Sequence, residues 1–131
     1  ESILDDVPLH FPALLEALKL TTKAAKVGFD WRDREEIFEK LVEETDELRR
    51  AIDSGERDRI EEEIGDLTFV VVNLARRLDI EPETALKRTN RKFRRRFRFI
   101  ESELRLSGKD LEGSGLDEMD TLWNVAKAKV G

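Results

Sequence analysis

The sequence predicts an all-α protein, with an antiparallel four-helix-bundle-like core and a short C-terminal helix. Charged residues make up 41% of the 131 residues, whereas there are only seven glycines and three prolines. Apolar residues recur every three or four positions along most of the chain, which is the period of an amphipathic helix. The one strongly β-forming run is short, at residues 69–72. A chain of this length fits one domain with a moderate core.

The first predicted helix follows an extended segment. Residues 1–11 are interpreted as a lead-in or the remnant of an interdomain linker, and residues 12–131 as the domain itself. The helix begins at Pro12, which is tolerated in a first turn, and continues to about Val27 with apolar residues on one face. Gly28 ends it.

The second and third predicted helices are joined by a tight turn. Asp33 is the expected N-cap of a helix that runs to about Ile52, and residues 53–55 form the turn. The third helix is expected from about Arg57 to Leu78. A strand at 69–73 is the alternative there, but the surrounding period of 3.6 outweighs it. We expect this helix to be the most buried, with a regular apolar stripe at Ile60, Ile64, Leu67, Val71, Leu74 and Leu78.

The fourth predicted helix is the longest. It begins at Pro82 and continues to about Leu106. Residues 107–115 contain three glycines and are predicted to form a loop, after which Asp117 is expected to cap a short last helix. The residues of the fourth helix predicted to face inward are Leu86, Thr89, Phe93, Phe97, Ile100 and Leu104.

Composition excludes several classes of protein. The absence of cysteine excludes disulfides, zinc–thiolate sites and cysteine nucleophiles. No apolar stretch approaches the roughly 20 residues of a membrane span, and no signal peptide opens the sequence, so we expect a soluble, cytoplasmic protein with no membrane partner. The net charge is −6, yet residues 87–98 carry eight Lys or Arg and no acid. Acidic and basic chemistry are therefore segregated along the chain.

Two pairs of acids point to a metal site. Glu44 and Glu47 lie three residues apart in the second helix, as do Glu63 and Asp66 in the third, so each pair shares a helix face. Four carboxylates directed at one point would repel each other unless a cation neutralised them. Oxygen ligands favour Mg²⁺, with Mn²⁺ as a possible substitute.

Their positions strengthen this interpretation over the alternative of a solvated helix surface. Glu44 falls in the same stripe as Ile37 and Leu41, and Glu63 lies between Ile60 and Leu67. An ionised carboxylate in an apolar stripe needs a compensating partner. The only histidine, at position 10, lies outside every predicted helix, which argues against a di-iron site of the Glu-x-x-His type.

The basic segment offers candidate substrate ligands. Lys92 and Arg96 lie four residues apart beside the apolar stripe of the fourth helix and could bind phosphate oxygens. Trp123 and Lys127, one turn apart in the last helix, could add an aromatic surface and another cation, although a tryptophan in this context is more often a core anchor. Nucleic-acid binding is disfavoured by the net charge and the lack of a recognisable binding motif.

These residues together resemble the MazG family of nucleoside triphosphate pyrophosphohydrolases, which belongs to the all-α NTP pyrophosphatase superfamily. The superfamily pattern E-E-x-x-E followed by E-x-x-D is matched here by Glu43, Glu44, Glu47, Glu63 and Asp66. Further runs that resemble MazG are KAAKVGFDW at 23–31, GDL at 65–67, VNLAR at 72–76, TNRKFRRRF at 89–97 and LWNVAK at 122–127.

The resemblance implies hydrolysis of nucleoside triphosphates between the α and β phosphates. It assigns Mg²⁺ binding and catalysis to Glu44, Glu47, Glu63 and Asp66, with Glu43 as an auxiliary acid. It assigns substrate binding to Lys92, Arg96, Trp123 and Lys127. It also implies a homodimer formed through the helices, and a chain most similar to the catalytic C-terminal domain of a two-domain protein or to a stand-alone relative of it.

The residues alone leave one alternative open. The acidic and basic faces could instead dock a protein or a nucleic acid in a non-catalytic interaction module, whose complexes would be sensitive to salt and independent of metal. Base preference cannot be derived from the sequence, and broad base specificity is the default expectation.

Overall fold

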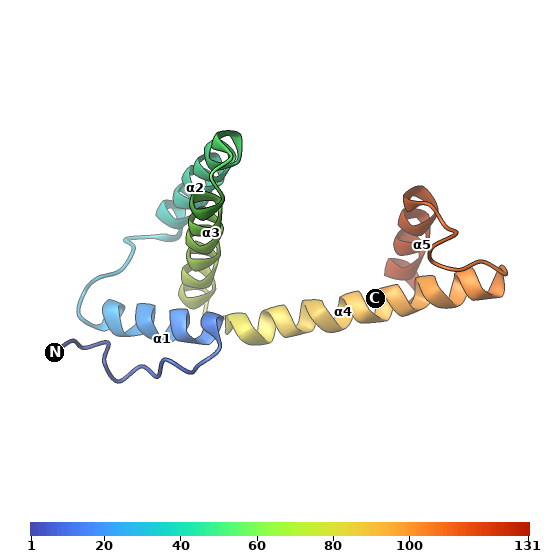
Figure 1. Cartoon of the computed structure of the whole chain (residues 1–131). Helices are drawn as coiled ribbons and strands as arrows, with labels where there is room; N and C mark the ends of the chain where they lie inside the picture. The colour runs from blue at the N-terminus through green and yellow to red at the C-terminus, as the bar shows by residue number, and fades with distance from the viewer. The chain divides into compact units, whose positions relative to one another are not determined.

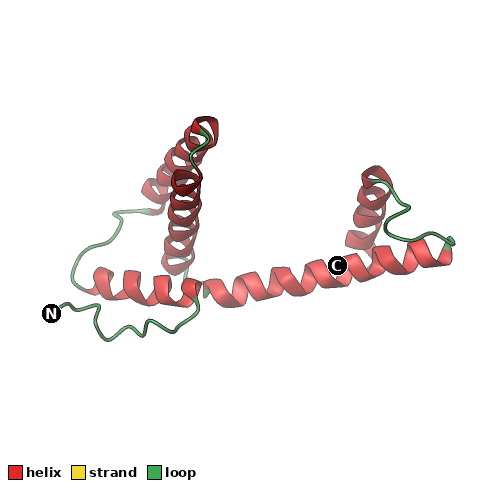
Figure 2. Cartoon of the chain, viewed as in Figure 1, coloured by secondary structure: helices red, strands yellow, loops and turns green.

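The computed structural model describes residues 1–131 as five helices joined by loops and contains no strand (Figures 1 and 2). The predicted all-α class is confirmed, and the β-forming run at 69–72 is helical. No helix combines the length and the hydropathy that crossing a membrane requires. The helices are α1 (Ala13–Lys26), α2 (Arg34–Ser54), α3 (Arg57–Arg77), α4 (Pro82–Leu106) and α5 (Leu116–Lys129).

The chain divides into two compact units, residues 1–83 and 84–131. In the first unit, α2 and α3 form an antiparallel hairpin and pack side by side, and α1 packs against α3 (Figure 1). The second unit contains α5 and nearly all of α4. The four-helix arrangement of the core, the domain boundary at residue 12 and dimerisation through the helices stay predictions.

Local residues determine where α2 begins and ends. The side chain of Asp33 accepts a hydrogen bond from the Glu36 amide at 3.0 Å, which confirms the predicted N-cap of α2. Gly55 ends α2 with φ of 74°, a left-handed conformation that glycine adopts without steric cost. Helix α2 therefore extends two residues beyond the predicted end at Ile52, and the turn to α3 is correspondingly short.

The last helix begins slightly earlier than predicted. Gly115, in an extended conformation, is the N-cap of α5, so the prediction that Asp117 caps this helix is wrong. Asp117 lies instead in the first turn, where its carboxylate still interacts favourably with the positive end of the helix dipole.

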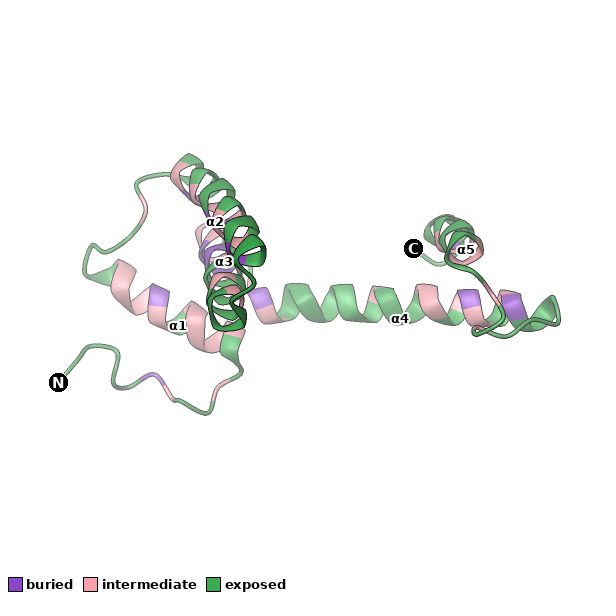
Figure 3. Cartoon of the chain, turned by 45° about the horizontal axis from the view of Figure 1, so that its top comes forward, coloured by how far each residue is buried: buried purple, intermediate pink, exposed green.

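The core of the first unit lies between α2 and α3 (Figure 3). Ile37 and Ala51 of α2 are fully buried, and Val70 and Val72 of α3 are nearly so. Part of the predicted α3 stripe was wrong, because Ile64, Val71 and Leu78 are exposed. Apolar residues cover several faces of α3, and periodicity alone does not say which face meets its neighbour.

The second unit has a smaller core. Ile100 and Leu104 of α4 are buried as predicted. Leu86 and Phe93 are about half exposed and Thr89 is exposed, against the prediction that they face inward. The buried positions lie toward the C-terminal end of α4, near the loop that leads into α5.

Candidate functional site

The α2–α3 hairpin brings three carboxylates together. Glu44 comes from α2, whereas Glu63 and Asp66 lie three residues apart on one face of α3. One oxygen from each of these residues lies within 4.8 Å of the corresponding oxygens of the other two. The antiparallel packing of the two helices therefore assembles three of the four predicted metal ligands.

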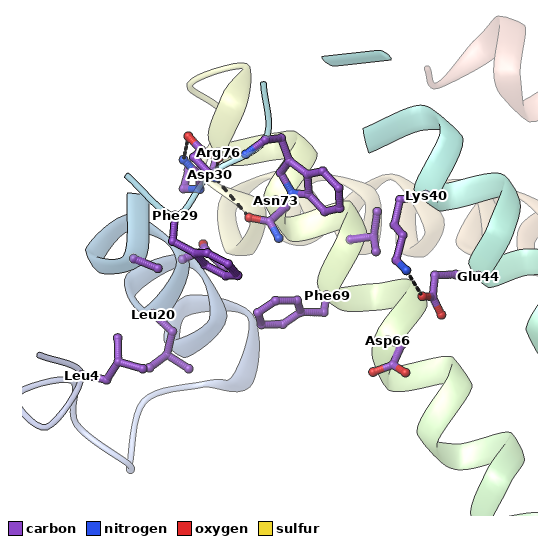
Figure 4. Close-up of a pocket in the computed structure, with 14 residues that line it drawn as sticks. Leu4, Leu20, Phe29, Asp30, Lys40, Glu44, Asp66, Phe69, Asn73 and Arg76 are labelled. Atoms are coloured by element: carbon purple, nitrogen blue, oxygen red, sulfur yellow. Dashed lines mark hydrogen bonds and ion pairs between the residues drawn. The ribbon is translucent and has the colours of Figure 1, made fainter. Parts of the chain in front are cut away.

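Two of these carboxylates contain oxygens that have no hydrogen-bond partner. Glu44 is only 5% exposed, and its Oε1 lies 3.2 Å from Nζ of Lys40 (Figure 4). Its other oxygen, Oε2, is buried without a partner, and the same holds for Oε2 of Glu63. Buried polar atoms are nearly always paired, because the loss of hydration is otherwise uncompensated.

The acids also act on each other electrostatically. Burial raises the pKa of Glu63 above its usual range, and repulsion from the charge of Glu47, together with interactions with Glu44 and Asp66, raises it further. Glu47 lies outside the group of three close oxygens, yet its charge reaches Glu63. Its role as a metal ligand stays a prediction.

The donor set fits a hard divalent cation. Three carboxylates converge, two of them hold an unpartnered buried oxygen, and no histidine or cysteine is nearby to favour a softer metal. A divalent ion bound there would coordinate the two unpartnered oxygens and relieve the repulsion among the three carboxylates.

Lys40 is part of this site and was missed by the sequence interpretation. Its Nζ lies 3.2 Å from an oxygen of Glu43 and 3.2 Å from Oε1 of Glu44, and these hydrogen bonds raise its pKa. The i, i+4 spacing from Lys40 to Glu44 was visible in the sequence, but such pairs are common on helix surfaces. Glu43 is about half exposed and meets the site only through Lys40.

A pocket of about 720 Å³ adjoins the acids. Glu44 and Asp66 line it on one side, Phe29 lies across from them, and Phe69 and Asn73 lie between (Figure 4). The sequence indicated an aromatic loop at residues 29–31 but did not predict that this loop would border the acidic cluster.

An ionic clamp fixes that loop against α3. The carboxylate of Asp30 accepts hydrogen bonds from Nη2 of Arg76 at 2.6 Å and from Nη1 of Arg77 at 3.2 Å. Arg77 also donates to the carbonyl oxygen of Trp31 at 2.9 Å. The hydrogen bond from Arg76 is the main reason that the pKa of Asp30 falls to about 2. The clamp joins residues 46 positions apart, so no local pattern indicates it.

The second unit holds the other predicted ligands. The Arg96 guanidinium lies 5.1 Å from the ring centroid of Trp123, and Arg96 Nε donates to the Gly131 carbonyl at 2.9 Å. The Phe93 ring lies 5.6 Å from that of Trp123. Lys92 is half-buried one turn before Arg96, and Lys127 is exposed one turn after Trp123. The structure thus brings Arg96 and Trp123 into contact, and the substrate roles of all four residues stay predictions.

Comparison with known proteins gives consistent matches. Residues 32–99 match the family model of the MazG nucleotide pyrophosphohydrolase domain. The chain is 41% identical over 130 residues to a nucleoside triphosphate pyrophosphohydrolase of Escherichia coli K12, covering 96% of this chain and 49% of the relative. It is 43% identical over 116 residues to a nucleoside triphosphate pyrophosphohydrolase/pyrophosphatase MazG of Thermotoga maritima, covering 88% and 44%.

A third relative is longer. The chain is 48% identical over 127 residues to the uncharacterized protein YabN of Bacillus subtilis, covering 96% of this chain and 26% of that protein. The chain thus spans about half the length of the first two relatives and about a quarter of the third.

Proposed function

Because the chain belongs to the MazG nucleotide pyrophosphohydrolase domain family, we propose that it hydrolyses nucleoside triphosphates to the monophosphate and pyrophosphate. The observation that carries this proposal is the cluster of Glu44, Glu63 and Asp66, in which two buried oxygens lack partners. A solvated surface patch would leave no such oxygens. The names of the Escherichia coli and Thermotoga maritima relatives support the reaction class.

We assign Mg²⁺ binding to Glu44, Glu63 and Asp66, together with Glu47. Mn²⁺ is proposed as a substitute ion at the same site. The bound ion would neutralise charge on the triphosphate and lower the pKa of an attacking water. Lys40 holds Oε1 of Glu44, which leaves Oε2 for the cation. One of the four carboxylates accepts the proton from the water.

The cations of α4 and α5 are proposed to bind the substrate. Lys92, Arg96 and Lys127 would stabilise phosphate oxygens by charge-assisted hydrogen bonds. Trp123, whose ring centroid lies 5.1 Å from the Arg96 guanidinium, would hold that cation in position for the substrate. The family resemblance, rather than local geometry, carries these four assignments.

We also propose that the protein is a homodimer that acts in the cytoplasm. Support for self-association comes from Ile64 and Val71 of α3 and Leu78 at its C-cap, which lie at successive seven-residue intervals and are all exposed. Such a stripe is costly to leave in water, and a second copy of the same helix pair would cover it.

The reaction is tested by incubating the chain with each NTP and dNTP in Mg²⁺ and measuring pyrophosphate and orthophosphate separately. We expect the nucleoside monophosphate and pyrophosphate in equal amounts. Release of orthophosphate alone would move the cleavage to the outer phosphates and refute the proposed reaction. Metal-independent, salt-sensitive binding of protein or nucleic acid without turnover would favour an interaction module instead.

Variants connect the reaction to the acids. Glu44→Gln and Asp66→Asn should each lower kcat by at least about 100-fold while circular dichroism remains helical, because each removes a charged oxygen ligand. Glu39→Gln is the matched control, since Glu39 is an exposed acid of α2 outside the cluster. Full turnover in both cluster variants would show that the acids are not the catalytic centre.

A further inference from the structure

The pocket beside the acids has two chemically different sides. Glu44 and Asp66 belong both to its lining and to the acidic cluster, so the pocket is continuous with the proposed metal centre. Away from them, the lining includes the aromatic side chains of Phe29, Trp31 and Phe69. Phe29 is 81% exposed and Phe69 41% exposed, which leaves aromatic surface open to the pocket. A volume of about 720 Å³ falls in the range of small-molecule sites.

Asn73 is the one buried side-chain amide of this pocket. It is only 7% exposed, and its Oδ1 accepts a hydrogen bond from Nη2 of Arg76 at 3.2 Å. Because Arg76 can only donate, this contact fixes the orientation of the amide. The nitrogen of Asn73 then faces away from Arg76, as Figure 4 shows, and its two hydrogens remain available as donors.

The same arginine is itself held in place. Arg76 is bound through both terminal nitrogens to Asp30, and its Nε is buried without a partner. The chain of contacts from Asp30 through Arg76 to Asn73 therefore positions the amide before any ligand arrives. A donor fixed in this way discriminates between ligands better than a mobile one, because little ordering is required on binding.

We propose that this pocket binds the nucleoside part of the substrate and that the Asn73 amide nitrogen donates a hydrogen bond to a keto group of the base. This inference rests on the proposed function, since a triphosphate bound at the acids places its nucleoside beside them. The aromatic rings stack on the base, and stacking accepts any base. Asn73 supplies the selectivity.

The exocyclic group of each base determines which nucleotides Asn73 should favour. Guanine, uracil and thymine present a keto oxygen where adenine and cytosine present an amino group. A donor meets the keto group favourably and the amino group unfavourably. The chain should therefore prefer guanine, uracil and thymine nucleotides over adenine and cytosine nucleotides by about tenfold in Kd.

The test compares base preference in wild type and in Asn73→Asp. Aspartate keeps an oxygen acceptor for Arg76 but replaces the donor nitrogen with a second acceptor. Binding of α,β-methylene GTP and α,β-methylene ATP, which cannot be cleaved between the α and β phosphates, is measured by calorimetry in Mg²⁺. Wild type should bind the guanine analogue about tenfold more tightly, and Asn73→Asp should reverse the order. Asn90→Asp makes the same change of charge at an exposed site on α4 and should leave the wild-type order of affinities unaltered.

Inorganic tripolyphosphate, which has no nucleoside, separates this inference from the proposed function. In Asn73→Asp, the ratio of the affinities for the guanine and adenine analogues should change. Tripolyphosphate should bind to Trp31→Leu as tightly as to wild type, because it makes no contact with the pocket. Trp31→Leu should weaken both nucleotide analogues, and this variant decides the matter if Asn73→Asp does not fold. If wild type binds the analogues in the expected order but releases no pyrophosphate from nucleoside triphosphates, the proposed reaction is refuted and the assignment of the nucleoside pocket stands.

Two results would overturn the pocket assignment. The first is an unchanged base order in a folded Asn73→Asp variant. The second is an unchanged affinity for both nucleotide analogues in a folded Trp31→Leu variant.

Discussion

Asp30 is the residue that most directly shapes the loop between α1 and α2. Its carboxylate is paired with both Arg76 and Arg77 of α3, and these contacts hold the loop beside the acids. Because the pKa of Asp30 in the folded protein, about 2, lies below its ordinary value of 3.8, the ionised form stabilises the fold. That contribution is present above about pH 4 and is lost as the pH falls toward 2.

Asp30→Asn should therefore lower the free energy of unfolding by about 1 kcal/mol at neutral pH, a value reduced for solvent screening at this partly exposed site. The difference between variant and wild type should shrink as the pH falls from about 4 to about 2. Urea unfolding followed by circular dichroism at several pH values measures it. Asp53→Asn, at an exposed aspartate near the end of α2, should show no such trend. A difference that does not vary with pH would contradict the assigned ion pairs.

Single residues also show how far the sequence could lead. The spacing of Glu44, Glu63 and Asp66 was enough to predict that they meet, because i, i+3 spacing and a short turn constrain two adjacent helices. The contact of Asp30 with Arg76 and the orientation of Asn73 could not be predicted, since they depend on which face of α3 the loop meets. The pattern of a single helix does not contain that information.

The helices themselves were largely predictable, because their ends are set by local residues. The Asp33 cap and the start at Pro82 were identified from sequence and confirmed, and Gly55 of the predicted turn ends α2, although the helix continues through Ser54. The exposed face of α3 was not. Its apolar residues exceed what α1 and α2 cover, so the stripe through Ile64, Val71 and Leu78 remains in water in the single chain.

This exposed stripe makes dimerisation testable at the level of one helix. Val71→Asp should weaken self-association by at least about tenfold, because a dimer formed on this face would bury an unpaired charge. Sedimentation equilibrium of the 15.2 kDa chain distinguishes monomer from dimer. Val27→Asp is the matched control, being the same substitution at an exposed valine following α1. A wild-type monomer, or equal effects of both variants, would exclude α3 as the dimer surface.

At the scale of the whole molecule, the chain has an acidic first unit and a second unit that contains the whole basic segment, residues 87–98. All three clustered acids lie in residues 1–83, whereas all four proposed substrate-binding residues lie in 84–131. Only Lys40 contacts the cluster from within the first unit, and it leaves one oxygen of Glu44 free.

The central claim is that the acids of the hairpin hold a divalent ion, and the most direct measurement is thermal unfolding of the chain at increasing Mg²⁺ concentration. At about ten times the dissociation constant, Mg²⁺ should raise the Tm of wild type and of Glu39→Gln by about 4 °C. The Tm of Glu44→Gln should not rise. A wild-type Tm that does not respond to Mg²⁺, or an equal rise in Glu44→Gln, would contradict the metal centre and with it the proposed reaction.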